Sequence, residues 1–150
     1  WNANGSDEVI FNISTNPQQD FMPLGKVASG GELSRFLLAI KVVLANSARS
    51  NTLIFDEVDS GVGGQTADAV GTRLFKLSER NQVIVITHSP QVAAKGKNHY
   101  LIEKVNIKNQ SITFCNKISY DNRIEEISRM LSGEKISDEA RAAAIQLINE

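Results

Sequence analysis

The sequence predicts an α/β fold with parallel strands and flanking helices, and three observations support this. Two short, β-prone apolar runs, 52–57 and 82–87, end in polar residues, as is typical of buried parallel strands. Apolar residues at helical spacing over 36–45 and 67–77 precede these runs. The resulting order of helix, strand, helix, strand is the one expected of a parallel sheet.

The remaining predicted elements lie before and after these strands and helices in the sequence. We expect residues 1–7 to be a disordered or artificial terminus and residues 8–150 to form one domain. A strand is predicted over 8–14, followed by a loop over 18–27. After a short helical turn from Pro90 come a strand pair at 99–104 and 111–118 and two helices at 122–131 and 137–149, separated by Ser132-Gly133.

The composition is that of an ordinary globular domain, with 41% hydrophobic and 22% charged residues. No apolar run reaches the length of a transmembrane helix and no signal-peptide pattern is present, so a cytoplasmic setting without membrane contact is expected. The net charge of −1 gives no general electrostatic reason to bind nucleic acid. The single cysteine, Cys115, is interpreted as a strand thiol without special chemistry. The weakly basic group of Lys95, Lys97, His99 and Lys104 is interpreted as a solvated face.

Ser29-Gly30-Gly31 stands just before the helical pattern that starts near Leu33. Free N–H groups and the helix dipole favour a phosphate at such a helix start, and the glycines allow close approach. The alternative is that Ser29 only caps a buried helix.

Asp56 and Glu57 are adjacent acids where the first apolar strand ends. Because they are consecutive at the C-terminal end of a strand, their side chains are expected to point to opposite sides. One carboxylate can then hold Mg²⁺ through water while the other polarises a nucleophilic water. The alternative is a solvated strand end.

His88 follows Thr87 where the second strand ends. Ligands of open α/β sheets lie outside the carboxyl ends of the strands, so Glu57 and His88 are expected to face one crevice. The alternative is a hydrogen-bonded structural histidine. Metal binding by His88 and His99 is not expected, because neither has neighbours at ligand-like spacing.

A phosphate-binding P-loop is absent from the sequence. Gly25-Lys26 and Gly96-Lys97 resemble its end, but both lack the earlier glycine and the following Ser or Thr of G-x-x-x-x-G-K-[ST].

Taken in order, the motifs resemble the C-terminal part of an ABC-type ATPase head. Val27–Arg35 (VASGGELSR), Phe55–Gly61 (FDEVDSG) and Thr87–Ala93 (THSPQVA) are similar to the RecN family of bacterial DNA repair proteins, relatives of the SMC proteins. The similarity runs from about Glu8 through the C-terminal tail. It implies a P-loop NTPase fold of the ABC ATPase type, of which this chain is the C-terminal lobe only.

The resemblance implies a role for each motif residue. Asp56 would hold Mg²⁺ through water, Glu57 would be the catalytic base or the group that positions the water, and His88 would sense the γ-phosphate. The signature residues Ser29, Gly30, Gly31 and Glu32 would cap the γ-phosphate of ATP held by a second head. Glu32 stands where ABC transporters usually carry Gln, which favours an SMC-like head. The transporter D-loop aspartate falls on Gly63, so that function is assigned either to Asp59 or to backbone groups of the same region.

By the same resemblance, the cofactors are ATP and Mg²⁺ and the activity is ATP hydrolysis in DNA double-strand break repair and recombination. The expected partners are an N-terminal lobe that carries the P-loop, a second head in a homodimer, and DNA. The setting would be the cytoplasm, at the nucleoid. We expect this chain alone to be inactive, because the P-loop is elsewhere. The alternatives are a non-catalytic SMC-like interaction module and, less favoured, a fragment of a transporter nucleotide-binding domain.

Overall fold

The structure, a computed structural model, describes residues 5–14, 18, 20–27, 33, 35–40, 52–107 and 110–150. Residues 35–40 are helical, in agreement with the first part of the helix predicted over 36–45. The second part of that helix lies outside the described residues, and so do the predicted signature residues Ser29, Gly30, Gly31 and Glu32.

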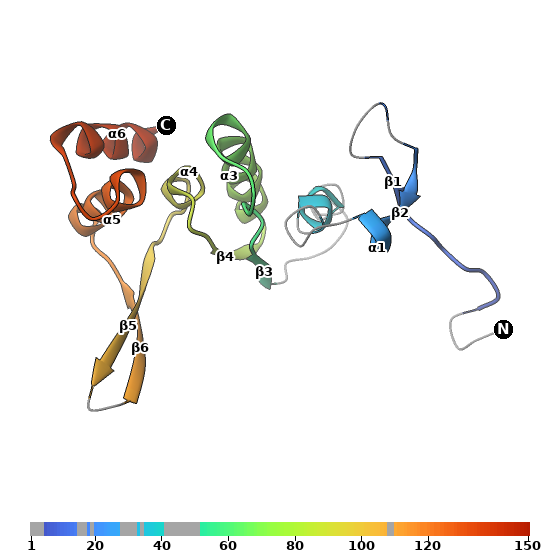
Figure 1. The fold of residues 1–150 in the computed structure, drawn as a ribbon, viewed down its shortest axis with the longest axis horizontal. Helices are drawn as coiled ribbons and strands as arrows, with labels where there is room; N and C mark the ends of the chain where they lie inside the picture. The colour runs from blue at the N-terminus through green and yellow to red at the C-terminus, as the bar shows by residue number, and fades with distance from the viewer. Residues whose placement is uncertain are drawn as a thin grey trace.

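A parallel strand pair lies at the middle of the molecule (Figure 1). β3 (Thr52–Asp56) pairs in parallel with β4 (Gln82–Ile86), and helix α3 (Gly64–Ser78) joins them. α3 covers one face of the pair, where Phe55 shares a buried core with the apolar stripe of the helix, Ala67, Val70, Leu74 and Leu77. The predicted parallel α/β arrangement is therefore present.

The opposite face of the β3–β4 pair is apolar but exposed. Ile54, Ile84 and Ile86 retain 67%, 45% and 51% of their side-chain exposure. We predicted buried strands from the continuous apolar runs, and this is only half correct within the described part of the chain. Alternate residues point to opposite faces of a strand, and α3 covers only one face.

The N-terminal elements differ from the prediction. The strand expected over 8–14 is reduced to β1 (Asn12–Ile13), which pairs antiparallel with β2 (Met22–Pro23). The expected loop over 18–27 contains β2 and the one-turn helix α1 (Leu24–Val27). An alternating apolar pattern forms a strand only where a partner supplies hydrogen bonds, and Pro23 has no N–H with which to extend the pairing.

The predicted strand pair is confirmed and is longer than expected. After the short helix α4 (Pro90–Ala94), β5 (Tyr100–Ile107) and β6 (Gln110–Lys117) form an antiparallel hairpin. Figure 1 shows this hairpin projecting away from α5 and α6, at the end of the molecule away from the N-terminus. Cys115 is a free, exposed thiol on β6.

Two capped helices complete the chain. α5 (Tyr120–Ser132) and α6 (Asp138–Asn149) begin after Ser119 and Ser137, whose hydroxyls each accept a hydrogen bond from a backbone N–H in the first turn. Gly133 ends α5 at φ 80°, a conformation that glycine adopts without strain. The helices enclose a second core of buried Ala94, Ile127 and Ala144.

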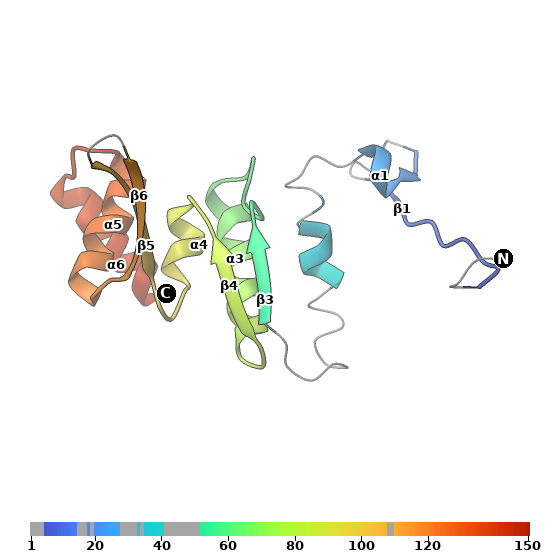
Figure 2. The same ribbon diagram turned by 90° about the horizontal axis from the view of Figure 1, so that it is seen from below.

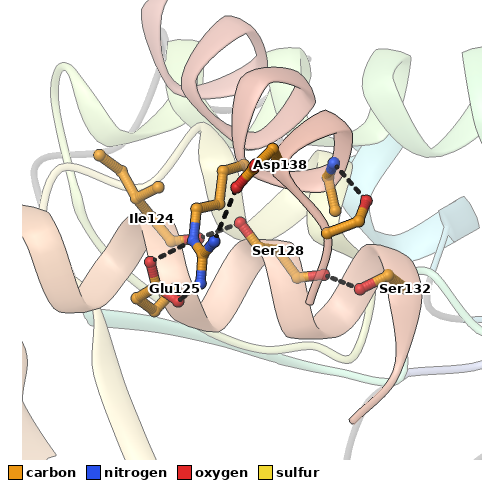
Figure 3. A network of polar contacts seen from close by, with 8 residues as sticks. Ile124, Glu125, Ser128, Ser132 and Asp138 are labelled. Carbon is orange, nitrogen blue, oxygen red and sulfur yellow. Dashed lines mark hydrogen bonds and ion pairs between the residues drawn. The ribbon is translucent and has the colours of Figure 1, made fainter. Parts of the chain in front are cut away.

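Polar contacts join α5 and α6 at the surface (Figure 3). Arg141 of α6 donates to both carboxylate oxygens of Glu125 on α5, at 2.8 and 3.2 Å, and to Asp138 at 3.1 Å. The Ser128 hydroxyl is instead turned into its own helix, where it donates to the Ile124 carbonyl at 2.7 Å. The interior between the helices is thus apolar and its rim is charged. No helix in the described ranges is long and apolar enough to cross a membrane.

Candidate functional site

The carboxyl ends of β3 and β4 lie side by side. The strands run in the same direction (Figure 2) and Asp56 stands opposite Ile86 in the register. The residues that follow, Glu57 and His88, therefore leave the sheet at one edge, and Asp56, Glu57 and His88 are all exposed there. An edge of this kind is where open α/β sheets bind ligands.

Glu57 has a left-handed backbone, with φ 55°. β3 ends at Asp56, and the Ser60 N–H donates to the Glu57 carbonyl at 3.0 Å to close a turn. Strand alternation therefore stops before Glu57 and does not determine which way its side chain points, contrary to our sequence argument. A residue other than glycine held in this conformation costs about 1–3 kcal/mol, and such strain is often found at functional sites.

Asp59 is fully buried, with 0% exposure, in the turn after β3. Its Oδ2 accepts a short hydrogen bond from the Thr87 hydroxyl and another from the Ser89 N–H at 3.1 Å. The Ser89 N–H also donates to Thr87 Oγ1 at 2.9 Å. Asp59 thus connects the turn after β3 to both neighbours of His88. That Asp59 takes part in nucleotide binding as a D-loop residue stays a prediction.

Thr87 and Ser89 are the site residues that sequence reasoning missed. The sequence places Thr87 before His88 and Ser89 after it, but gives neither residue a role. Their partner lies 28 and 30 residues away in the sequence. The available signal was a pair of hydroxyl residues flanking a histidine after one strand, with an acid in the turn after the neighbouring strand.

Arg35 connects the predicted signature region to the same turn. This residue lies in the helix that follows the signature stretch, and its Nη1 donates to the Ser60 carbonyl at 2.8 Å. Arg35 was quoted within a motif but given no role from the sequence. The contact shows that the described part of this helix and the strand end with Asp56 and Glu57 belong to one local structure.

The basic residues 95–104 lie elsewhere and are not a uniformly solvated face. Lys95 forms an ion pair with Asp68 at 3.1 Å, and the Lys97 ammonium lies 5.5 Å from the ring centre of Phe75. His99 is half-buried. Burial, and then the charge of Arg123, lower the pKa of His99, while Glu126 opposes this shift.

In the described part of the chain, no group of three or more His, Cys, Asp or Glu side chains could by itself hold a metal ion. The exposed Asp56 suits a single contact to Mg²⁺ through water, an ion that commonly takes one or two carboxylates together with substrate phosphates and waters. The residues therefore fit a metal that arrives with a nucleotide.

Parallel strands with flanking helices, an added hairpin and two terminal helices agree with the order of elements predicted from the sequence. No family model matches the sequence. Over 98% of its length, the chain is similar to curated proteins named DNA repair protein RecN. It is 45% identical to that of Rickettsia felis, 48% to that of Xylella fastidiosa and 44% to that of Haemophilus influenzae. Over this length, the chain is similar to one part of the RecN proteins.

The chain spans about a quarter of the length of these relatives, with 27% of the Rickettsia felis protein and 26% of the Xylella fastidiosa protein covered. A solved structure from work on the ATP-driven dimerization and DNA-stimulated activation of SMC ATPases matches 79% of this chain. The match covers 70% of that structure, at 18% identity and a TM-score of 0.49. This likeness is too slight to add to the support from the sequence relatives.

Proposed function

We propose that this chain is the C-terminal part of an ATPase that acts in DNA double-strand break repair and recombination. The observation that carries the proposal is the exposure of Asp56, Glu57 and His88 at one edge of a parallel strand pair, in a chain that is similar to RecN proteins over 98% of its length. The name of the relatives supports the role in DNA repair, and the strand-end chemistry supports ATP hydrolysis.

In this proposal Glu57 takes a proton from the water that attacks the γ-phosphorus of ATP. The new bond forms between that water oxygen and phosphorus, and the bond from phosphorus to the oxygen bridging to the β-phosphate breaks, which releases ADP and phosphate. His88 donates a hydrogen bond to a γ-phosphate oxygen and stabilises the charge there. Asp56 would hold Mg²⁺ through water, and the ion would neutralise charge on the phosphates.

The ATP would be held by the P-loop of an N-terminal lobe. Ser29, Gly30, Gly31 and Glu32 would act on the nucleotide of a second head, so that ATP brings two heads together as a homodimer and hydrolysis releases them. DNA would be the target of the assembled protein. The net charge of −1 supplies no attraction of its own. We place the protein in the cytoplasm, at the nucleoid.

A reconstitution experiment tests this division of the site. This chain alone should hydrolyse no ATP in the presence of Mg²⁺, and addition of the remaining part of the protein as a second polypeptide should restore turnover. Restored turnover should disappear when Mg²⁺ is chelated. Hydrolysis by this chain alone, or complete protein that binds no ATP, would refute the proposal.

A non-catalytic interaction module is the second candidate, favoured by the exposed apolar face of β3–β4 with Ile54, Ile84 and Ile86. The two candidates differ in the effect of Ser29→Arg. This change should prevent ATP-dependent assembly and turnover if Ser29 contacts nucleotide, and should leave both unchanged in a docking module.

A further inference from the structure

The contacts of Asp59 enclose His88 from both sides. Thr87 and Ser89 are its immediate neighbours in sequence, and each donates a hydrogen bond to the same Asp59 oxygen, Oδ2. The shared Ser89 N–H, which also donates to Thr87 Oγ1 at 2.9 Å, closes the group into a small ring. The peptide that carries His88 is therefore held at both ends by a single carboxylate.

The Asp59 carboxylate has no other evident task. It is fully buried, and its Oδ1 has no hydrogen-bond partner among the described residues. A buried carboxylate is costly unless hydrogen bonds compensate it, and bonds to a charged acceptor are roughly twice as strong as neutral ones. The described hydrogen bonds of the Asp59 carboxylate therefore lead only to Thr87 and Ser89, the two neighbours of His88.

Asp59 is also tied to Glu57 by the backbone. The Ser60 N–H donates to the Glu57 carbonyl at 3.0 Å, and the Val62 N–H donates to the Asp59 carbonyl at 3.3 Å. These bonds form one tight turn, in which Glu57 takes its left-handed conformation at φ 55°. These backbone bonds do not involve the Asp59 carboxylate, so a change of that side chain leaves the turn at Glu57 in place and acts on the His88 side of the edge.

We propose that Asp59 is a positioning residue that fixes His88 relative to Glu57 for ATP hydrolysis. The inference rests on the proposed function and adds to it a role for Asp59 within its own lobe. Because its carboxylate is turned inward, Asp59 acts through Thr87 and Ser89 and not by contact with the reacting phosphate.

The first test compares variants of the complete protein in steady-state ATP hydrolysis. Asp59→Ala removes both bonds, and Thr87→Val removes the hydroxyl at nearly constant volume. Each should lower kcat about 10-fold or more, the size expected for a lost hydrogen bond to a charged group, while KM for ATP stays within about 2-fold. Asp59→Asn can keep an oxygen at the position of Oδ2, and Thr87→Ser keeps a hydroxyl, so both should stay within about 3-fold of normal kcat.

The second test asks whether Asp59 acts through His88. In a His88→Ala background, Asp59→Ala should lower kcat no further than about 2-fold, because the group it positions is gone. An equal loss from Asp59→Ala with and without His88 would overturn the proposal. A loss that Asp59→Asn and Thr87→Ser fail to rescue would overturn it as well.

A third readout separates this inference from the proposed function. Amide hydrogen exchange over residues 87–91 should become at least about 10-fold faster in Asp59→Ala. It should not change in Asp68→Ala, which removes a carboxylate paired with Lys95 away from the strand ends. Unchanged exchange in Asp59→Ala would show that Asp59 does not hold residues 87–89 in place, and this would refute the inference whether or not the protein is an ATPase. Absence of ATP hydrolysis by the unaltered protein would refute the proposed function instead.

Discussion

The strand ends of β3 and β4 and the helix pair α5 and α6 are built in opposite ways. The helix pair has serine N-caps, a glycine C-cap and a buried hydrophobic core around Ile127, which is 0% exposed. The strand ends expose Asp56, Glu57 and His88, and hold Glu57 in a strained backbone conformation. We therefore expect the helix pair to contribute mainly stability, while the proposed function assigns the chemistry to the strand ends. Substitutions in the two regions should therefore have separable effects.

The largest expected effect on stability comes from the core between the helices. Ile127→Ala should lower the free energy of unfolding by about 3 kcal/mol, since it removes buried methyl groups and leaves a cavity. Chemical denaturation measures the loss, and turnover per folded molecule should not change. The matched control is Leu131→Ala on the same helix, where the side chain is 37% exposed and the loss should be smaller. Equal losses at the two positions would contradict the assigned core.

His88→Ala should have the opposite effect to Ile127→Ala, with a loss of turnover and almost no loss of stability. Loss of a group that stabilises charge on the γ-phosphate should lower kcat of the complete protein about 100-fold. Because His88 is exposed, the free energy of unfolding should change by about 0.5 kcal/mol or less. Asn98→Ala, at an exposed loop position, serves as the control and should alter neither quantity. A stability loss similar to that of Ile127→Ala would show that His88 is a structural residue.

His99, close to α5, should make the helix end of the molecule sensitive to acid. Burial, and secondly the charge of Arg123, lower the pKa of His99 below its ordinary 6.5, and Glu126 opposes this. Below pH 6.5 the unfolded chain binds a proton at His99, whereas in the folded chain His99 stays unprotonated until the pH is lower. Stability should therefore be complete above about pH 6.5 and decrease as the pH falls toward the folded-state pKa. His99→Gln should flatten this part of the curve, and an unchanged slope would contradict the assignment.

Arg141→Ala should have the smallest effect. It removes the contacts with Glu125 and Asp138, but all three side chains are well exposed, at 42%, 48% and 96%. Such pairs contribute little, so Tm should fall by about 2 °C or less. The difference from the unaltered protein should disappear at high salt. A larger, salt-independent decrease would place Arg141 in the packing of the helices.

What the sequence predicted well depends on local signals. The spacing of apolar residues identified α3, α5 and α6, and the Ser132-Gly133 break agrees with the glycine that ends α5. The parallel pairing of β3 and β4 followed from two β-prone runs separated by a helix. Where the expectation was wrong, over 8–14, the pattern was present but the strand partner was only two residues long.

The arrangement at the strand ends was only partly predictable. The location of Asp56, Glu57 and His88 at one edge could be predicted because they stand where the apolar runs end, and parallel strands bring such positions together. The burial of Asp59 was not predicted, since it depends on hydroxyl and amide donors that are distant in sequence. Neither was the left-handed conformation of Glu57, which the turn imposes against the intrinsic preference of the residue.

The central claim, that the strand-end edge hydrolyses ATP, is tested most directly by Glu57→Gln in the complete protein. Turnover and ATP-dependent dimer formation would be measured in the same sample, with Glu79→Gln at the exposed end of α3 as the control for the same chemical change. The account predicts that Glu57→Gln lowers turnover at least about 100-fold while ATP-dependent dimers persist. Turnover that survives the substitution would contradict it.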